Sequence, residues 1–235
     1  CDKVSSGCTN CFAESIAKRF WKGRPFTDVQ CHYDRLEQPL HWKKPATIFV
    51  CSMGDLFHKD VPDKFQYEVF QMMCIGAPQH TYIILTKRPD IMADRYADFK
   101  RNLLTLWGTY WHHRKEYKTT LDNIILGVSV EDQKTWNERV PLLLNIPAKT
   151  RIVSIEPMLQ WINVDKYLPK LSGIICGCES GTNRRKFEEY WARDVKDTCV
   201  DYGIPFFMKQ SIQNGKLVKM PKLDGRVYNQ MPEGK

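Results

Sequence analysis

The 235-residue sequence lacks the patterns that would place it in several common classes of protein. No apolar run reaches the roughly 18 residues that a membrane span requires. No basic stretch followed by an apolar one, the pattern of a secretion signal, is visible. Neither a G-x-G-x-x-G nor a Walker sequence occurs, which argues against the nucleotide-binding forms of an open α/β sheet. These absences predict a cytoplasmic protein that does not enter the membrane.

Cysteine, by contrast, is abundant, with nine residues in the chain. An odd number of cysteines without an export signal argues against a disulfide framework. Cys74 and Cys199 fall in apolar helical patterns and are expected in the core. Cys1, Cys8 and Cys11 instead form the spacing C-x6-C-x2-C within the first dozen residues. This triplet is therefore the first candidate for chemistry.

The formal net charge of +8 permits an anionic partner such as nucleic acid. Residues 99–122, with the stretch "LWGTYWHHRKEYKTT", are both basic and aromatic and read as an insertion. Such a segment is either a solvated helix and loop or a contact for nucleic acid, because aromatic rings stack on bases while Lys and Arg meet phosphates. We expect one domain over residues 1–210, followed by a Gly-, Pro- and Lys-rich surface tail over residues 211–235.

Six short apolar runs alternate with amphipathic stretches along the chain. Each run is apolar at both parities, which is typical of a strand buried on both faces of a parallel sheet. The runs are 48–52, 82–86, 124–128, 151–155, 173–177 and 205–208. Helical patterns between them include one that follows Pro62 and one that ends before Gly203. The repeat predicts an α/β fold, either a partial or full TIM-like (β/α) barrel or an open doubly wound sheet.

Nearly every apolar run ends in polar residues. The carboxyl ends of parallel strands meet at one rim, so these residues are expected to share a polar active site. For Lys87, Glu156, Glu179 and Lys209 the alternative is an ion pair at the rim, and for Asp132 and Ser180 it is a helix cap. The candidates are Ser52, Asp55, Lys87, Ser129, Glu131, Glu156, Glu179 and Lys209.

The cysteine triplet fits two kinds of metal site. A structural zinc site needs four protein ligands, and Cys31 or His32 would supply the fourth. A [4Fe–4S] cluster held by three thiolates instead leaves one iron open to a ligand that is not protein. S-adenosylmethionine fills such a position through its amino and carboxylate groups. The sequence of the triplet alone leaves both readings open.

Seven stretches between residue 1 and about residue 210 carry a family resemblance. They are "KVSSGCTNCFAE", "HWKKPATIFVCSMGDLFHKDVPD", "APQHTYIILTKRP", "ILGVSVEDQ", "RIVSIEPML", "CGCESG" and "GIPFFMKQ". Through them the chain resembles a phage-associated three-cysteine-motif family, which is similar to the radical S-adenosylmethionine superfamily. The superfamily's usual spacing is C-x3-C-x2-C, so the first gap is longer here. A Trp-Asn-Pro-containing lead-in typical of the family is absent, so we expect the first barrel strand to be truncated.

The resemblance implies a [4Fe–4S] cluster on Cys1, Cys8 and Cys11, S-adenosylmethionine as cofactor, an external electron donor and a cytoplasmic location, in the host cell if phage-encoded. It further implies that Phe12 packs against the cluster or the adenine. The remaining implied roles are the methionine amino group for Ser52 and Asp55, the ribose or carboxylate for Ser129 and Glu131, and catalytic contacts to substrate or cofactor for Lys87, Glu156, Glu179 and Lys209.

The reaction expected from this resemblance is hydrogen abstraction from a nucleic acid or nucleotide by a 5′-deoxyadenosyl radical. Two alternatives of other classes stay open. One is a zinc-stabilised nucleic-acid-binding module without catalysis. The other is a catalytically inactive barrel that acts as a partner subunit.

Overall fold

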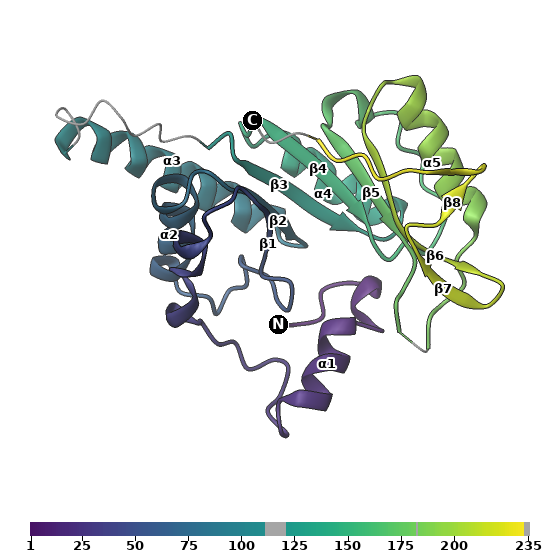
Figure 1. The fold of residues 1–235 in the computed structure, drawn as a ribbon, viewed down its shortest axis with the longest axis horizontal. Helices are drawn as coiled ribbons and strands as arrows, with labels where there is room; N and C mark the ends of the chain where they lie inside the picture. The colour runs from purple at the N-terminus through teal and green to yellow at the C-terminus, as the bar shows by residue number, and fades with distance from the viewer. Residues whose placement is uncertain (111–120, 182, 233–235) are drawn as a thin grey trace.

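The fold is a mixed α/β structure built on one mostly parallel sheet (Figure 1). A computed structural model describes residues 1–110, 121–181 and 183–232, and side chains 103–110 are not among those described. The sheet has the order β1-β2-β3-β4-β5-β6-β7, in which β1 to β6 are parallel and β7 is antiparallel to β6. The strands are β1 (Thr47–Val50), β2 (Thr81–Thr86), β3 (Ile124–Val130), β4 (Thr150–Ile155), β5 (Gly173–Gly177), β6 (Phe206–Gln213) and β7 (Lys216–Lys219).

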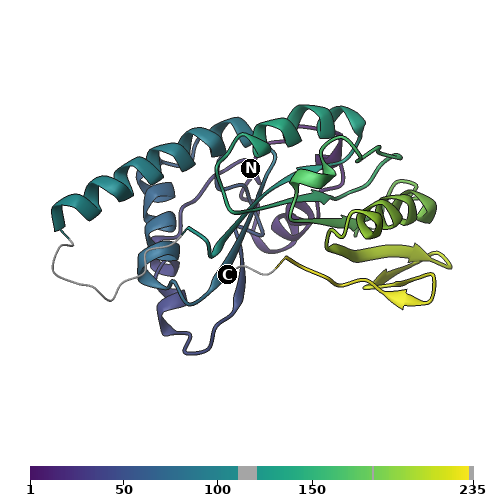
Figure 2. The ribbon, with the colours of Figure 1, turned by 90° about the horizontal axis from the view of Figure 1, so that it is seen from above.

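Consecutive parallel strands are neighbours throughout, so the sheet is singly wound. Right-handed crossovers then carry the connecting helices to the same face, and Figure 2 shows α3, α4 and α5 along one side of the sheet. The helices are α1 (Phe12–Phe20), α2 (Asp63–Gln71), α3 (Pro89–Tyr110), α4 (Gln133–Leu144) and α5 (Glu189–Asp201), with short turns η1 (Ser6–Cys8), η2 (Tyr33–Arg35), η3 (Gln38–His41), the π-helical η4 (Met72–Gly76) and η5 (Leu168–Lys170). The sheet curls into a half-barrel and is open between β1 and β7, so the prediction of a partial barrel is confirmed and a closed one is not observed.

Two apolar layers explain why the predicted strands are apolar at both parities. On β3, Leu126 and Val128 face the helices and join the large core that contains Trp136. Ile125 faces the concave side, where it packs with equivalent isoleucines of β2, β4 and β5 in a smaller cluster. The alternation continues past the strand ends and decides which polar side chains point into the half-barrel.

The predicted helices and core cysteines agree with the structure in most details. Pro62 precedes α2 as its N-cap residue, and Pro141 lies inside α4 without ending it. Cys74 and Cys199 are fully buried, as expected. The predicted insertion at residues 99–122 continues α3 to Tyr110, and its remaining basic-aromatic part, at 111–120, lies outside the described residues. In the described part of the chain, no helix is long and apolar enough to cross a membrane.

The prediction of a surface tail over residues 211–235 is wrong for the described part of that segment. Residues 211–213 complete β6, and β7, β8 (Lys222–Leu223) and β9 (Arg226–Val227) follow. Ser211 and Leu223 are fully buried, and the amide of Met208 donates to the Tyr228 carbonyl at 2.8 Å. The overlooked signal is Asn-Gly at 214–215, where both residues have the positive φ that a tight hairpin turn requires.

Candidate active site at the carboxyl edge of the sheet

Polar side chains gather on the concave side of the half-barrel where the parallel strands end. In the sheet register, Ser129 of β3 lies beside Ser154 of β4, and Ser154 lies beside Ile175 of β5. Ile175 belongs to the concave cluster, so the two serines share its face. Glu131 and Glu156 follow two residues later at the same parity. The predicted convergence of strand ends on one rim is therefore observed for these strands.

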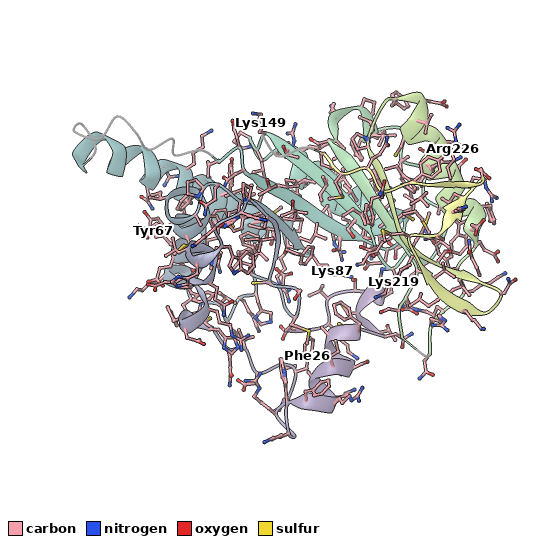
Figure 3. All side chains as sticks on the ribbon, viewed as in Figure 1. Phe26, Tyr67, Lys87, Lys149, Lys219 and Arg226 are labelled. Atoms are coloured by element: carbon pink, nitrogen blue, oxygen red, sulfur yellow. The ribbon has the colours of Figure 1, made fainter. Side chains whose placement is uncertain are left out.

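The cysteine-bearing N-terminal loop lies against this rim. Figure 1 shows the N-terminal loop and α1 beyond the arrowheads of the central strands, and in Figure 3 the labelled Lys87 lies between this loop and the strands. A Cβ on Gly7 would come within 2.7 Å of Lys87 Nζ and 3.1 Å of the Glu131 carboxylate, so any larger residue would have to displace the end of the Lys87 side chain. Asn10 Nδ2 donates to Glu179 Oε2 at 3.1 Å. Two contacts thus fix the loop to the ends of different strands.

Glu131 is the most buried charge of the rim. Its Oε2 accepts hydrogen bonds from Lys87 Nζ at 3.2 Å and from Arg139 Nη1 at 3.1 Å. Its Oε1 is buried and has no hydrogen-bond partner among the described residues. Burying a charge without full hydrogen bonding is costly, so such an atom calls for a functional or solvent explanation. Lys87 also donates to Ser5 Oγ at 3.4 Å, which ties the pair to the cysteine loop.

Asp55 and Ser52 lie in the connection between β1 and α2, and their environments differ. The Asp55 carboxylate accepts from Thr86 Oγ1 at 2.7 and 2.9 Å, from Arg88 Nη1 at 2.9 Å, and from two backbone amides. These four donors, with the Thr86 hydroxyl shared between the two oxygens, surround the carboxylate, so Asp55 joins its loop to the end of β2. Ser52 is exposed and makes no side-chain hydrogen bond within the described residues. Of the two, Ser52 keeps the freer polar group.

Glu156 and Lys209 form a pair that crosses β5. Lys209 Nζ lies 2.9 Å from Glu156 Oε1, and Ser154 Oγ donates to Glu156 Oε2 at 2.8 Å. The strand between them carries Gly177, where a Cβ would lie only 2.9 Å from Glu156 Oε1. The missing side chain therefore leaves room for the pair. A register shift beside Gly177 places Lys209 in an irregular part of β6.

Glu179 is held by Arg185, a cation that was not among the site residues predicted from the sequence. Arg185 contacts it through its guanidinium, and the Arg185 amide donates to Oε2 at 2.6 Å. Burial by itself raises the pKa of Glu179, but the Arg185 and Asn10 hydrogen bonds outweigh burial and hold that pKa below its usual value. Asn10, Arg139 and Arg185 were all missed as site residues. Their positions depend on how loops and α4 fold back over the rim.

The three candidate metal ligands are free thiols, each partly buried, in the loop that covers the rim. Burial raises the pKa of Cys8, but the charge of Lys87 and hydrogen bonds from the loop outweigh it, so this pKa lies below its usual value. That environment favours the thiolate that metal binding requires. Cys11 caps α1, and the amino group of Cys1 donates to the Phe26 carbonyl at 2.7 Å.

The donor chemistry and the position of the triplet therefore fit a cluster, but the described conformation does not assemble it. Within residues 1–110, 121–181 and 183–232, no group of three or more His, Cys, Asp or Glu side chains is placed to hold a metal ion. The same holds for the zinc alternative with Cys31 or His32. Phe12 begins α1 and is 47% exposed, so it packs against neither core.

The structure also shows the contacts of Asp132, His58 and His80. Asp132 caps α4, since its Oδ1 accepts from the Thr135 amide at 2.8 Å. Its other oxygen lies 3.5 Å from Ser6 Oγ of the cysteine loop. His58 and His80 are buried, and the Nδ1 atom of each accepts a hydrogen bond from a backbone amide.

Comparison with known proteins gives a family but no functional relative. No curated protein and no solved structure shows significant similarity to the chain. One family model covers residues 1–232, nearly the whole sequence. The chain therefore belongs to the family described as protein of unknown function DUF5131.

Proposed function

We propose that this chain is a radical S-adenosylmethionine enzyme whose active site lies between the N-terminal cysteine loop and the carboxyl edge of the half-barrel. The observation that carries the proposal is the docking of that loop by Gly7 against Lys87 and Glu131, and by Asn10 against Glu179. A loop with three free thiols is thereby held over a ring of polar strand ends. Strand ends of this kind are where α/β barrels bind their substrates.

Cys1, Cys8 and Cys11 would hold a [4Fe–4S] cluster, and the longer first gap places six residues between the first two ligands. When bound and reduced, such a cluster supplies the electron that cleaves S-adenosylmethionine to a 5′-deoxyadenosyl radical. Lys87 lowers the local cost of the Cys8 thiolate by its positive charge. Its bond to Ser5 at 3.4 Å keeps it beside the loop.

The rim residues would bind and orient the polar parts of the cofactor. Glu131 is fixed by two cations through one oxygen, which leaves its second oxygen to accept a hydrogen bond from a ligand hydroxyl or ammonium group. Ser129 and Ser52 supply further hydroxyl groups, whereas Asp55 acts by positioning its loop. Lys209 is 52% exposed and is the rim cation most open to a substrate anion.

We further propose a nucleic acid or nucleotide as the substrate. The net charge of +8 supports an anionic partner, and charge by itself does not distinguish one nucleotide sequence from another. The basic-aromatic stretch at residues 111–120 lies outside the described residues and adds no structural support.

Anaerobic reconstitution of the full chain with iron and sulfide tests the cofactor. The expected product is a brown protein with about four iron and four sulfide ions per chain. On reduction it should cleave S-adenosylmethionine to 5′-deoxyadenosine and methionine. Cys8→Ser and Cys11→Ser should bind no intact cluster, whereas Cys31→Ser, a partly buried cysteine outside the triplet, should bind it normally.

The same measurements separate the alternatives. One tightly bound zinc ion, lost in Cys31→Ser as well as in the triplet variants, would replace this proposal with the zinc-stabilised module. A complete cluster that never cleaves S-adenosylmethionine with any reductant would point to the inactive partner subunit.

A further inference from the structure

A cavity of about 620 Å³ lies beside the candidate active site, and most of its lining residues have no proposed contact with the cofactor. Its lining includes residues of the loop between α1 and β1, from Trp21 to Trp42, and Figure 1 shows this loop running from α1 toward α2. Its inner wall is β1 and the connection from β1 to α2. The volume lies in the range of sites that hold a small ligand.

The walls of the cavity carry aromatic rings that packing covers only in part: Trp42 meets His80 edge to face, with ring centroids 5.9 Å apart, and the ring centroid of Trp21 lies 5.8 Å from that of Phe26. Trp42 and Phe49, both in its lining, are 45% and 47% exposed. Trp21, also in the lining, carries the Arg24 guanidinium 4.0 Å above its ring. Folding normally covers large rings, so two half-exposed rings beside one hollow indicate a ligand surface. Their flat faces suit a flat partner.

The cavity also has an unused donor. Arg24 Nε is buried and has no hydrogen-bond partner among the described residues, and the Asp28 carboxylate lies 3.6 Å from it, beyond hydrogen-bond distance. Arg35 adds a second guanidinium to the lining. A ligand with acceptor atoms would satisfy the Arg24 donor. A purely aliphatic ligand would leave it unpaired at a cost.

The cavity borders the proposed cofactor site, because Cys1, Ser52 and Asp55 also belong to its lining. We propose that this cavity holds a single nucleobase of the nucleic acid or nucleotide substrate, stacked on Trp42 and hydrogen-bonded by Arg24.

A nucleobase fits these features better than the other common occupants. It has a π-face for the rings, acceptor atoms for a guanidinium, and a phosphate whose charge the basic chain attracts. An acyl chain would leave Arg24 unpaired. A peptide strand would pair with the backbone of β1, a mode that needs no aromatic wall. A base must leave its stack to enter, so single strands should bind better than duplexes.

The inference rests on the proposed function for what happens to the base, but binding itself needs neither cluster nor S-adenosylmethionine. The experiment is therefore done on the full chain without cofactors. Fluorescence anisotropy follows a labelled single-stranded DNA 12-mer, and the variants are Trp42→Ala, Trp42→Phe and Trp161→Ala. Trp161 is the matched control because it is also 45% exposed but lies outside the cavity.

Loss of one stacked ring should weaken binding about 5- to 100-fold in Trp42→Ala. Trp42→Phe should restore most of the affinity, and Trp161→Ala should stay within about twofold of wild type. Arg24→Gln should also weaken binding of the 12-mer, because it removes the guanidinium that donates to the base. Circular dichroism confirms that each variant is folded.

Three results would overturn the inference. The first is equal affinity of Trp42→Ala and Trp161→Ala for the 12-mer. The second is equal binding of an abasic 12-mer, which would show that only phosphates are recognised. The third is preference for the duplex. Each leaves cluster formation untouched, so a failed cavity and a failed radical enzyme are distinguishable.

Discussion

Replacement of Glu131 by glutamine tests whether the buried charge network positions the site. Glu131 is fully buried, and Lys87 and Arg139 both contact its Oε2 at 3.1–3.2 Å. Each contact has a Coulomb energy of about 5 kcal/mol at an effective dielectric constant of about 20. Desolvation of the carboxylate and of the two cations cancels much of that sum. The variant keeps the shape of the side chain but loses its charge.

The net effect should follow the pattern of buried pairs from which one partner is removed. Such changes cost about 3–5 kcal/mol, and the retained amide oxygen places Glu131→Gln near the lower end, at about 3 kcal/mol. For a chain of this length, a loss of about 3 kcal/mol lowers the unfolding midpoint by about 6–12 °C. Two cations would then face each other without their shared anion, and the contact with Gly7 should loosen.

Thermal and urea unfolding of wild type and variant measure this cost. The control is Glu138→Gln on α4, because Glu138 is exposed and its contact with Lys134 is 3.9 Å. That control should change stability by less than about 0.5 kcal/mol. If Glu131→Gln matched the control, Glu131 would not be a buried ionic anchor. The argument for a docked cysteine loop would then lose its central contact.

Three further changes probe other parts of the site and fold. Gly177→Ala puts a Cβ 2.9 Å from Glu156 Oε1, so it should separate Glu156 from Lys209. Cleavage of S-adenosylmethionine should then slow, while the free energy of unfolding changes by less than about 1 kcal/mol. Unchanged turnover would contradict a role for the pair. Leu223→Ala should lower the free energy of unfolding, measured in urea, by about 2–5 kcal/mol, because the side chain is fully buried. A negligible loss would support the prediction of a surface tail instead. The lowered pKa of Glu179 stabilises the fold above its unfolded value near 4.5, and this stability is lost as the pH falls through the lower folded pKa. Glu179→Gln should therefore flatten the acid side of the stability–pH profile, and an unchanged profile would contradict the assignment.

The strands and helices were predictable because each depends on a local pattern. Five apolar runs at both parities identified β1 to β5 to within two residues at each end, and a sixth identified the start of β6, since burial on two faces leaves no alternation. The C-terminal strands β7 to β9 were missed because each has two to four residues and together they carry three lysines. The Asn-Gly turn at 214–215 was the usable signal.

The partners of the rim residues were not predictable in the same way. Lys87 and Glu131 are 44 residues apart, and their contact depends on the curl of the sheet rather than on spacing. Arg139 reaches Glu131 from the second turn of α4. Gly7 gives no such signal in the sequence, since the effect of a missing side chain depends on the opposing atoms, which only the fold brings into place.

Every carboxylate predicted at the rim has a cation beside it. Asp55 pairs with Arg88, Glu131 with Lys87 and Arg139, Glu156 with Lys209, and Glu179 with Arg185. Rim ion pairing, the simpler reading of each residue, is therefore observed for all four. Pairing and ligand binding are compatible only where a paired group keeps an acceptor free. In the described part of the chain, Glu131 Oε1 is the buried carboxylate oxygen left without a hydrogen bond. Among the four predicted carboxylates, Glu131 is therefore the strongest candidate for a direct cofactor contact.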